Sequence, residues 1–125
     1  MPVVPGLAAS IELKVEPVDT AESLRSGDVP MLGTPRLVGL VEEATVAAIR
    51  DHLEPGMTTV GMRVQLDHLI PTPVGETVKA DATVERVEGR RLTFTFSVTS
   101  NRGLVSAGRV VRVVVNRDRF IEKAH

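Results

Sequence analysis

The hydrophobic pattern changes its period along the chain. Ala9 to Val15 predicts a first strand. From Pro35 to about His52 the apolar positions recur with the period of an α-helix and form one continuous arc, made of Leu37, Val38, Leu40, Val41, Ala44, Thr45, Ala48 and Ile49. From Val60 onwards, apolar and polar residues alternate in successive segments, which predicts four long strands up to Val115.

The ends of the helix carry local signals. Thr34 is expected as its N-cap and Pro35 as its first residue, and the run 53–56 (Leu-Glu-Pro-Gly) ends it. The segment from Pro17 to Pro30 is polar and irregular, and it is too long for a simple turn. Loops of this length are often lids or binding loops.

This order of elements predicts an α+β fold. One strand, a loop and a long helix are followed by four strands, which we expect in hairpin succession. A long antiparallel β-sheet wrapped around one central α-helix is the hotdog architecture. The last strand is apolar on both faces near its end (Val110, Val111, Val113, Val114 and Val115), so we expect cover on both sides. One helix covers only part of one sheet face, and the rest of that surface normally meets a second copy.

Length and composition bound the possibilities. The 125 residues predict a single domain over residues 1–125. The absence of Cys excludes disulfides, cysteine zinc sites, iron–sulfur clusters and a thiol nucleophile. The aromatic inventory is only three Phe, which argues against base-stacking recognition of nucleic acid and against an aromatic peptide groove.

Targeting signals and net charge restrict the function less than length and composition do. No apolar run approaches the ~20 residues of a membrane helix, and no secretory signal is visible, so a cytoplasmic protein without a membrane partner is expected. The net charge is −1, yet eight Arg stand between Arg86 and Arg119 against two acids. Such a surface could hold a phosphorylated ligand, although 12 Arg against 3 Lys also fits a general coding preference.

Three side chains are candidates for chemistry. Glu42 lies within the apolar arc. If it is buried there, its pKa is raised, which suits a general acid or base; alternatively, its side chain reaches solvent past Leu53. By alternation, His68 lies on the same strand face as Val60, Met62, Val64 and Leu66. It is either a catalytic acid or base, or a core residue whose ring nitrogens are hydrogen-bonded. If Thr34 is the N-cap, its hydroxyl oxygen accepts a backbone hydrogen bond and its proton remains free to donate. The adjacent helix N-terminus favours a bound anion or oxyanion.

Other enzyme motifs are missing. The sequence contains no phosphate loop, no His-Glu-x-x-His and no Gly-x-Ser-x-Gly. Its three His have no metal-ligand spacing, so no metal and no cofactor are predicted.

The spacing of the three candidates matches a known family. The run 33–42 (GTPRLVGLVE), with Thr34 eight residues before Glu42, resembles the helix start of fluoroacetyl-CoA thioesterase-like hotdog proteins. The run 60–68 (VGMRVQLDH), closed by 72–75 (TPVG), resembles that family's strand, in which a His follows a Gly by seven residues. The run 87–92 (VEGRRL) resembles its hairpin. The similarity extends from about Gly33 to Phe120.

The resemblance implies an acyl-CoA thioesterase with Thr34, Glu42 and His68 as its catalytic set. It also implies that Gly61 lies near the acyl carbonyl and Arg112 near the active site, with acyl-CoA as the substrate and a homodimer or a higher homo-oligomer as the assembly. The family carries Phe just before the Thr as a hydrophobic lid. Residues 24–32 contain none here, which predicts a different acyl group from fluoroacetyl.

The chemistry of a thioester suits this set, because the leaving thiol has a pKa of about 8.5 and needs little acid assistance. Glu42 would activate water or attack directly, His68 would carry the proton, and Thr34 would position the substrate or take part in acyl transfer. Two other functions stay open. A hotdog hydratase or dehydratase would need an Asp or His in a helix motif that is not visible, and a non-catalytic acyl-CoA-binding or regulatory module would leave Glu42 and His68 structural.

Overall fold

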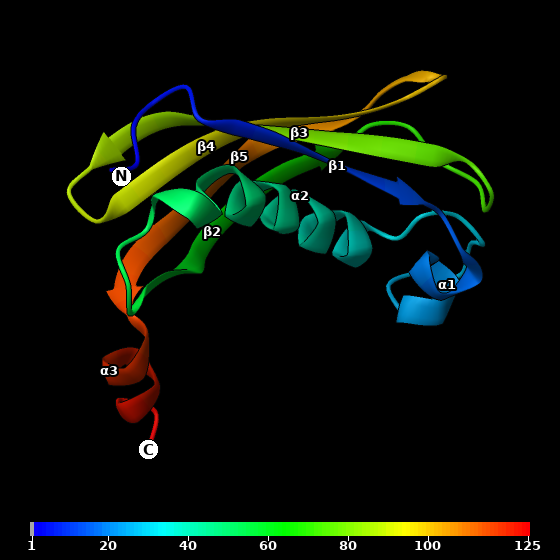
Figure 1. Ribbon diagram of the computed structural model, residues 1–125. Coiled ribbons are helices and arrows are strands. Elements are labelled where there is room, and N and C mark those ends of the chain that lie inside the picture. Colours follow the sequence, from blue (N-terminus) through cyan, green and yellow to red (C-terminus); the bar gives the residue numbers. More distant parts are fainter. Residues whose placement is uncertain (1) are drawn as a thin grey trace.

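The computed structural model describes residues 2–125 as one curved antiparallel sheet with a long helix on its concave side (Figure 1). The strands are β1 (Ala8–Lys14), β2 (Met57–His68), β3 (Thr77–Glu88), β4 (Arg91–Ser100) and β5 (Gly103–Asn116). The helices are α1 (Ala21–Leu24), α2 (Thr34–Ile49) and α3 (Arg117–Glu122), with 3₁₀ turns η1 (Pro17–Asp19) and η2 (Arg50–His52). This is the expected α+β hotdog arrangement. In the described residues, no helix is long and apolar enough to cross a membrane.

The core lies between α2 and the middle of the sheet. The fully buried side of α2 presents Leu37, Leu40, Val41 and Ala44 to an inner sheet face that is equally apolar. That inner face consists of Val78, Ala80, Ala82, Val84, Leu92, Phe94, Phe96, Val98, Val105 and Val110. Small Ala residues on both surfaces let the helix lie close to the sheet, and two of the three Phe fill its centre.

The strand order β1-β3-β4-β5-β2 corrects the expected hairpin succession. β3, β4 and β5 do follow one another as hairpins, but β2 pairs with β5 and not with β3. The connection 69–76 therefore crosses from one side of the sheet to the other. Alternation along a strand identifies its faces but not its neighbours, so this pairing was not visible in the sequence.

A β-bulge in β2 corrects the expected face of Met62. The pairing with β5 shifts between Gly61, opposite Arg112, and Arg63, opposite Val111. The extra residue reverses the alternation, so Met62 is 44% exposed instead of facing the helix. Beyond the bulge Val64, Leu66 and His68 lie on one half-buried face, as expected.

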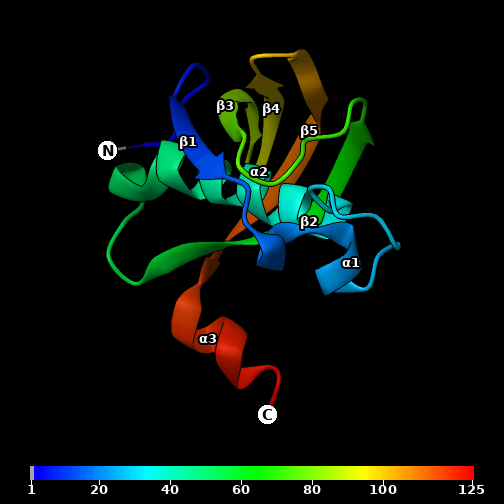
Figure 2. The ribbon, with the colours of Figure 1, turned by 90° about the vertical axis from the view of Figure 1, so that its right-hand side faces the viewer.

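The helix start and the outer sheet face also differ from expectation. Gly33, and not Thr34, is the N-cap of α2, because its carbonyl accepts the first helical bonds from Arg36 and Leu37, each at 3.1 Å. Figure 2 shows helix α2 on the concave side only, so among residues 2–125 nothing provides the expected cover over Val111 and Val113 on the outer face, and both are half-buried.

The segment between β1 and α2 is more regular than expected. It holds η1 and α1, and Thr20 caps α1 by accepting a bond from the Ser23 backbone. A salt bridge of 3.1 Å between Asp19 and Arg36 ties it to α2, and the bridge between Met31 and Pro73 ties it to the connection after β2. These contacts hold the segment over the start of α2.

Candidate active site

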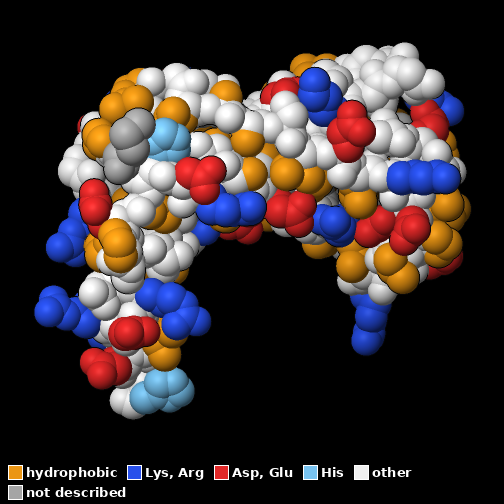
Figure 3. All heavy atoms as spheres, in the orientation of Figure 1, with side chains coloured by type: hydrophobic (Ala, Val, Ile, Leu, Met, Phe, Trp, Pro, Cys, Tyr) orange, Lys and Arg blue, Asp and Glu red, His pale blue; other side chains and the backbone are white. Residues whose placement is uncertain are grey.

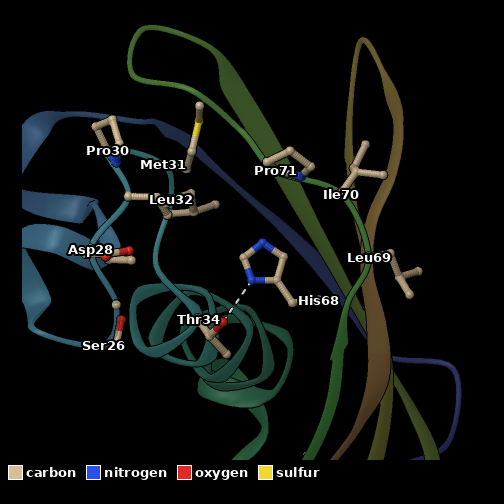
Figure 4. A pocket seen from close by; sticks show the side chains of 13 residues that line it. Ser26, Asp28, Pro30, Met31, Leu32, Thr34, His68, Leu69, Ile70 and Pro71 are labelled. Atoms are coloured by element: carbon tan, nitrogen blue, oxygen red, sulfur yellow. Dashed lines mark hydrogen bonds between the residues drawn. The ribbon is translucent and has the colours of Figure 1, made fainter.

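Thr34 and His68 meet where the start of α2 faces the end of β2. Thr34 Oγ1 lies 2.9 Å from His68 Nδ1 (Figure 4). The hydroxyl is available because Gly33 occupies the cap position, so Thr34 is not needed there. A threonine hydroxyl and an imidazole nitrogen at this distance form a hydrogen-bonded pair through which a proton can move.

The environment of the imidazole favours its neutral form. Burial lowers the pKa of His68 below its usual 6.5, and the Ile70 backbone opposes part of that shift. A neutral imidazole has one acceptor nitrogen, and we assign it to Nδ1, which receives the Thr34 proton. Nε2 is buried and makes no well-formed hydrogen bond within residues 2–125. His68 is therefore set up as a base toward the Thr34 hydroxyl.

A cavity of about 540 Å³ opens beside this pair. Its walls come from the segment before α2 and from the connection after β2, and they are mainly apolar: Val29, Met31, Leu32, Leu69, Ile70 and Pro71. Figure 4 shows Ser26 and Asp28 on the side of the cavity away from His68. An apolar hollow beside a base and a hydroxyl is a suitable place for an acyl group.

Glu42 belongs to a second cluster. Its Oε2 forms a 3.2 Å salt bridge with Arg112 Nη1, and the same guanidinium donates to Thr59 Oγ1 at 2.9 Å and to the Thr59 carbonyl at 3.1 Å. The Arg112 side chain is only 8% exposed, against 36% for Glu42, so Glu42 lacks the burial on which its expected role rested. Burial lowers the pKa of Arg112, and the Glu42 carboxylate opposes this shift.

Gly61 completes this cluster by having no side chain. A Cβ built on Gly61 would collide with Glu42 Oε2 and would lie 3.7 Å from Arg112 Nη1. The strand backbone at Gly61 thus runs directly against the carboxylate. Thr59, which holds Arg112, was missed in the sequence, since its inward direction depends on the bulge at Gly61.

Within one chain the predicted residues form two half-sites. Eight residues separate Thr34 from Glu42, which corresponds to about 12 Å along an α-helix. The chain thus brings Thr34 to His68, and it brings Glu42 to Arg112 and Gly61, but the two groups stay apart. No group of three His, Cys, Asp or Glu in the described part of the chain could hold a metal ion.

Comparisons with known proteins identify the family of this chain. Residues 15–118 match the family described as fluoroacetyl-CoA-specific thioesterase. The fluoroacetyl-CoA thioesterase of Streptantibioticus cattleyicolor is 36% identical over 87 residues, which is 70% of this chain and 63% of the relative's length. The match therefore spans less than two thirds of that protein.

Solved structures give the same result. A fluoroacetyl-CoA thioesterase variant in complex with acetyl-CoA superposes with a TM-score of 0.92 at 28% identity, covering 98% of this chain and 96% of that one. A hypothetical protein of Thermus thermophilus, described as a thioesterase superfamily member, gives a TM-score of 0.89 at 28% identity over 97% and 90% of the two chains. Because the family match covers residues 15–118, most of the length of this chain, the chain belongs to the fluoroacetyl-CoA-specific thioesterase family.

Proposed function

We propose that this protein hydrolyses a small acyl-CoA thioester to the free acid and CoA, as one domain over residues 1–125, with Thr34, Glu42 and His68 as its catalytic set. The observation that carries the proposal is the 2.9 Å contact between Thr34 and a half-buried His68, whose pKa is lowered by burial, at the mouth of an apolar cavity. Membership of a thioesterase family and the likeness to a thioesterase complexed with acetyl-CoA support the substrate class.

The proposed chemistry gives each residue of the set a part in hydrolysis, and it leaves nucleophilic and general-base routes as alternatives. His68 accepts the proton that the attacking water, or the Thr34 hydroxyl in the acyl-transfer route, loses as its oxygen bonds to the thioester carbon, and it returns that proton to the departing thiolate as the C–S bond breaks. Thr34 positions the acyl group or takes part in its transfer. The backbone N–H of Thr34 stabilises the oxyanion, since Pro35 has no N–H and those of Arg36 and Leu37 donate to Gly33, and in the second half-site the backbone N–H of Gly61 contributes to the same task. Glu42 orients and activates that water, or it attacks the carbonyl itself to form an acyl anhydride, which water then cleaves to the free acid and the Glu42 carboxylate.

The two half-sites are completed in a homodimer in this proposal. Thr34 and His68 of one copy would face Glu42, Gly61 and Arg112 of a second copy. Strand β2 is suited to such pairing, because it forms one edge of the sheet over 12 residues. The underside of the molecule is also hollowed between α3 and α1 (Figure 3), and a second chain can fill this hollow.

The acyl group in this proposal is aliphatic and larger than fluoroacetyl. The cavity beside Thr34 holds about 540 Å³, and no Phe lies in the segment 24–32 that forms one of its walls. Met31 and Ile70 line it instead; both side chains are apolar, and the flexible Met31 side chain can adapt to branched or longer acyl chains. Selectivity for fluoroacetyl-CoA is therefore not proposed, and the cytoplasm remains the predicted compartment.

Thiol release tests the function. Purified protein is offered short, branched and aromatic acyl-CoAs, and free CoA thiol is followed with a thiol reagent, to which the Cys-free chain contributes no background. Turnover of at least one aliphatic acyl-CoA is expected. Calorimetric binding of acyl-CoAs without any turnover would instead identify a non-catalytic acyl-CoA-binding or regulatory module.

A further inference from the structure

A cationic cleft lies at the end of the molecule opposite the Thr34 pocket. It has a volume of about 450 Å³ between the start of β2, the β3–β4 turn, the end of β5 and α3. Arg90, Arg119 and Lys123 line it together with Asn116 and Phe120. Within residues 2–125 none of these three cations is in a salt bridge with a carboxylate. The cleft therefore carries three positive charges that other groups of the chain do not neutralise.

A second arginine-rich hollow, on the outer face of the sheet, provides a comparison. This smaller hollow is lined by four arginines, Arg63, Arg86, Arg91 and Arg109. Two of them are paired, Arg86 with Glu88 at 3.3 Å and Arg109 with Glu85 at 3.1 Å. Two of the four arginines in the outer hollow thus have a carboxylate partner, whereas none of the three cations in the cleft has one among the described residues.

A groove adjoins the cleft and includes Thr59, the residue that holds Arg112 of the Glu42 half-site. Its volume is about 340 Å³, and it runs between the second half of α2 and the start of β2. Val46, one turn after Glu42, lines it at one end, and so does Thr59, which binds Arg112. Met57 lines both the groove and the cleft, so the two hollows meet at this residue.

The length of this path fits the arm of CoA. Four residues separate Gly61, at the carbonyl position, from Met57, at the cleft, which is about 13 Å along a strand. The pantetheine arm places about thirteen bonds between its sulfur and the first phosphorus, roughly the length of four extended residues or ~14 Å. An arm that begins at Gly61 therefore delivers its phosphates to the cleft of the same chain.

The remaining walls suit a nucleotide. Phe120 is 45% exposed, so its ring can receive the flat face of a purine. Arginine forks bind phosphate oxygens bidentately, and the lysine adds a point charge.

We propose that Arg90, Arg119 and Lys123 bind the phosphates of the 3′-phosphoadenosine diphosphate part of CoA, with the pantetheine arm in the groove past Thr59 and Met57. The assignment rests on the proposed function for the identity of the ligand. It gives a role to α3, which extends beyond the sheet (Figures 1 and 3).

Calorimetry on the whole protein tests the cleft without requiring turnover. The double variant R119Q/K123Q removes two charges, and R63Q/R91Q removes two unpaired charges from the outer face as the matched control. Wild-type protein is expected to bind CoA more tightly than pantetheine. The cleft variant should bind CoA roughly 3- to 30-fold more weakly, because exposed charge pairs are each worth a small factor.

Two further measurements keep this test specific. The charge-conserving variant R119K/K123R should retain most of the affinity for CoA, and thermal unfolding should show each variant to be folded. An affinity for CoA in R119Q/K123Q equal to that of the wild type would overturn the assignment. So would an equal loss in R63Q/R91Q, because this would indicate a general effect of net charge.

Kinetics separate this assignment from the proposed reaction. The preference for acyl-CoA over acyl-pantetheine, taken as the ratio of their kcat/KM values, should fall about 10-fold in R119Q/K123Q through KM. If wild-type protein binds CoA through the cleft but hydrolyses no thioester, the proposed function fails and the nucleotide site stands. If it hydrolyses acyl-CoA and the cleft variant keeps the full preference, the nucleotide site fails and the function stands.

Discussion

Replacing Gly61 with Ala probes the contact between β2 and Glu42. The added Cβ would collide with Glu42 Oε2, and the nearest other group is Arg112 Nη1 at 3.7 Å. Oε2 is the end of a flexible side chain, so the carboxylate can swing away without distorting the strand. The substitution therefore displaces Glu42 and breaks its 3.2 Å salt bridge with Arg112.

The magnitude follows from the exposure of the pair. Losing one partner of a fully buried ion pair costs about 3–5 kcal/mol. Here Glu42 is 36% exposed and Arg112 keeps two hydrogen bonds to Thr59, so water and Thr59 offset most of the loss. With the small gain from replacing Gly in a strand, the free energy of unfolding should fall by about 1 kcal/mol, or roughly 3–6 °C in Tm. Turnover should fall further, by ~10²-fold, since a displacement of about 1 Å at a reacting group has such effects.

Calorimetric melting and thiol release measure these two effects. Gly39 provides the matched control: it lies on α2 near Glu42, and a Cβ there meets only Arg36 Nη1 at an ordinary 3.7 Å. Gly39→Ala should raise stability by about 0.5–1 kcal/mol through helix propensity. In a Glu42→Ala background, which leaves room for the Cβ, Gly61→Ala should change stability by less than about 0.5 kcal/mol. An undiminished loss in that background would refute the steric explanation.

Four further predictions concern the two half-sites. Glu42→Gln and His68→Ala should each lower the rate of thiol release by ~10²-fold or more, and near-normal rates in either variant would remove that residue from the mechanism. Because burial lowers the pKa of His68, the unfolded chain binds a proton on that residue at higher pH than the folded chain does. The free energy of unfolding should therefore fall as pH drops below about 6.5, and His68→Gln should remove this part of the loss in a pH series of denaturant titrations. The rate should rise with pH through a midpoint below 6.5, and a midpoint above that value would contradict the assigned environment of His68. Thr34→Val, which keeps the shape but removes the hydroxyl, should lower kcat by ~10²-fold if Thr34 takes part in acyl transfer, whereas a rise in KM alone would restrict it to positioning.

Periodicity was sufficient to predict most of the fold. Apolar spacing placed α2 and all five strands to within about three residues, because a long amphipathic element must turn one face to the core. α3 was not predicted, since its six residues carry no periodic apolar pattern of useful length. The neighbours of β2 and the direction of Met62 were also wrong, because pairing and bulges are set by contacts between distant strands.

The candidate site was predicted by residue type more than by geometry. Thr34 was expected as a cap, and the structure gives that position to Gly33, which leaves the Thr34 hydroxyl to His68. The partnership of Glu42 with Arg112 could not be deduced from two residues 70 positions apart. The separation into two half-sites is likewise a consequence of three-dimensional packing.

Mixing two inactive variants tests the central claim most directly. His68→Ala and Glu42→Gln are each purified, mixed in equal amounts, unfolded and refolded together, and assayed for thiol release from an acyl-CoA that the wild type hydrolyses. If the site joins Thr34 and His68 of one copy to Glu42 of another, half of the dimers are mixed and each contains one intact site. The mixture should then recover about a quarter of the wild-type activity. A mixture as inactive as its two parents, under conditions in which refolded wild type is active, would contradict the shared site.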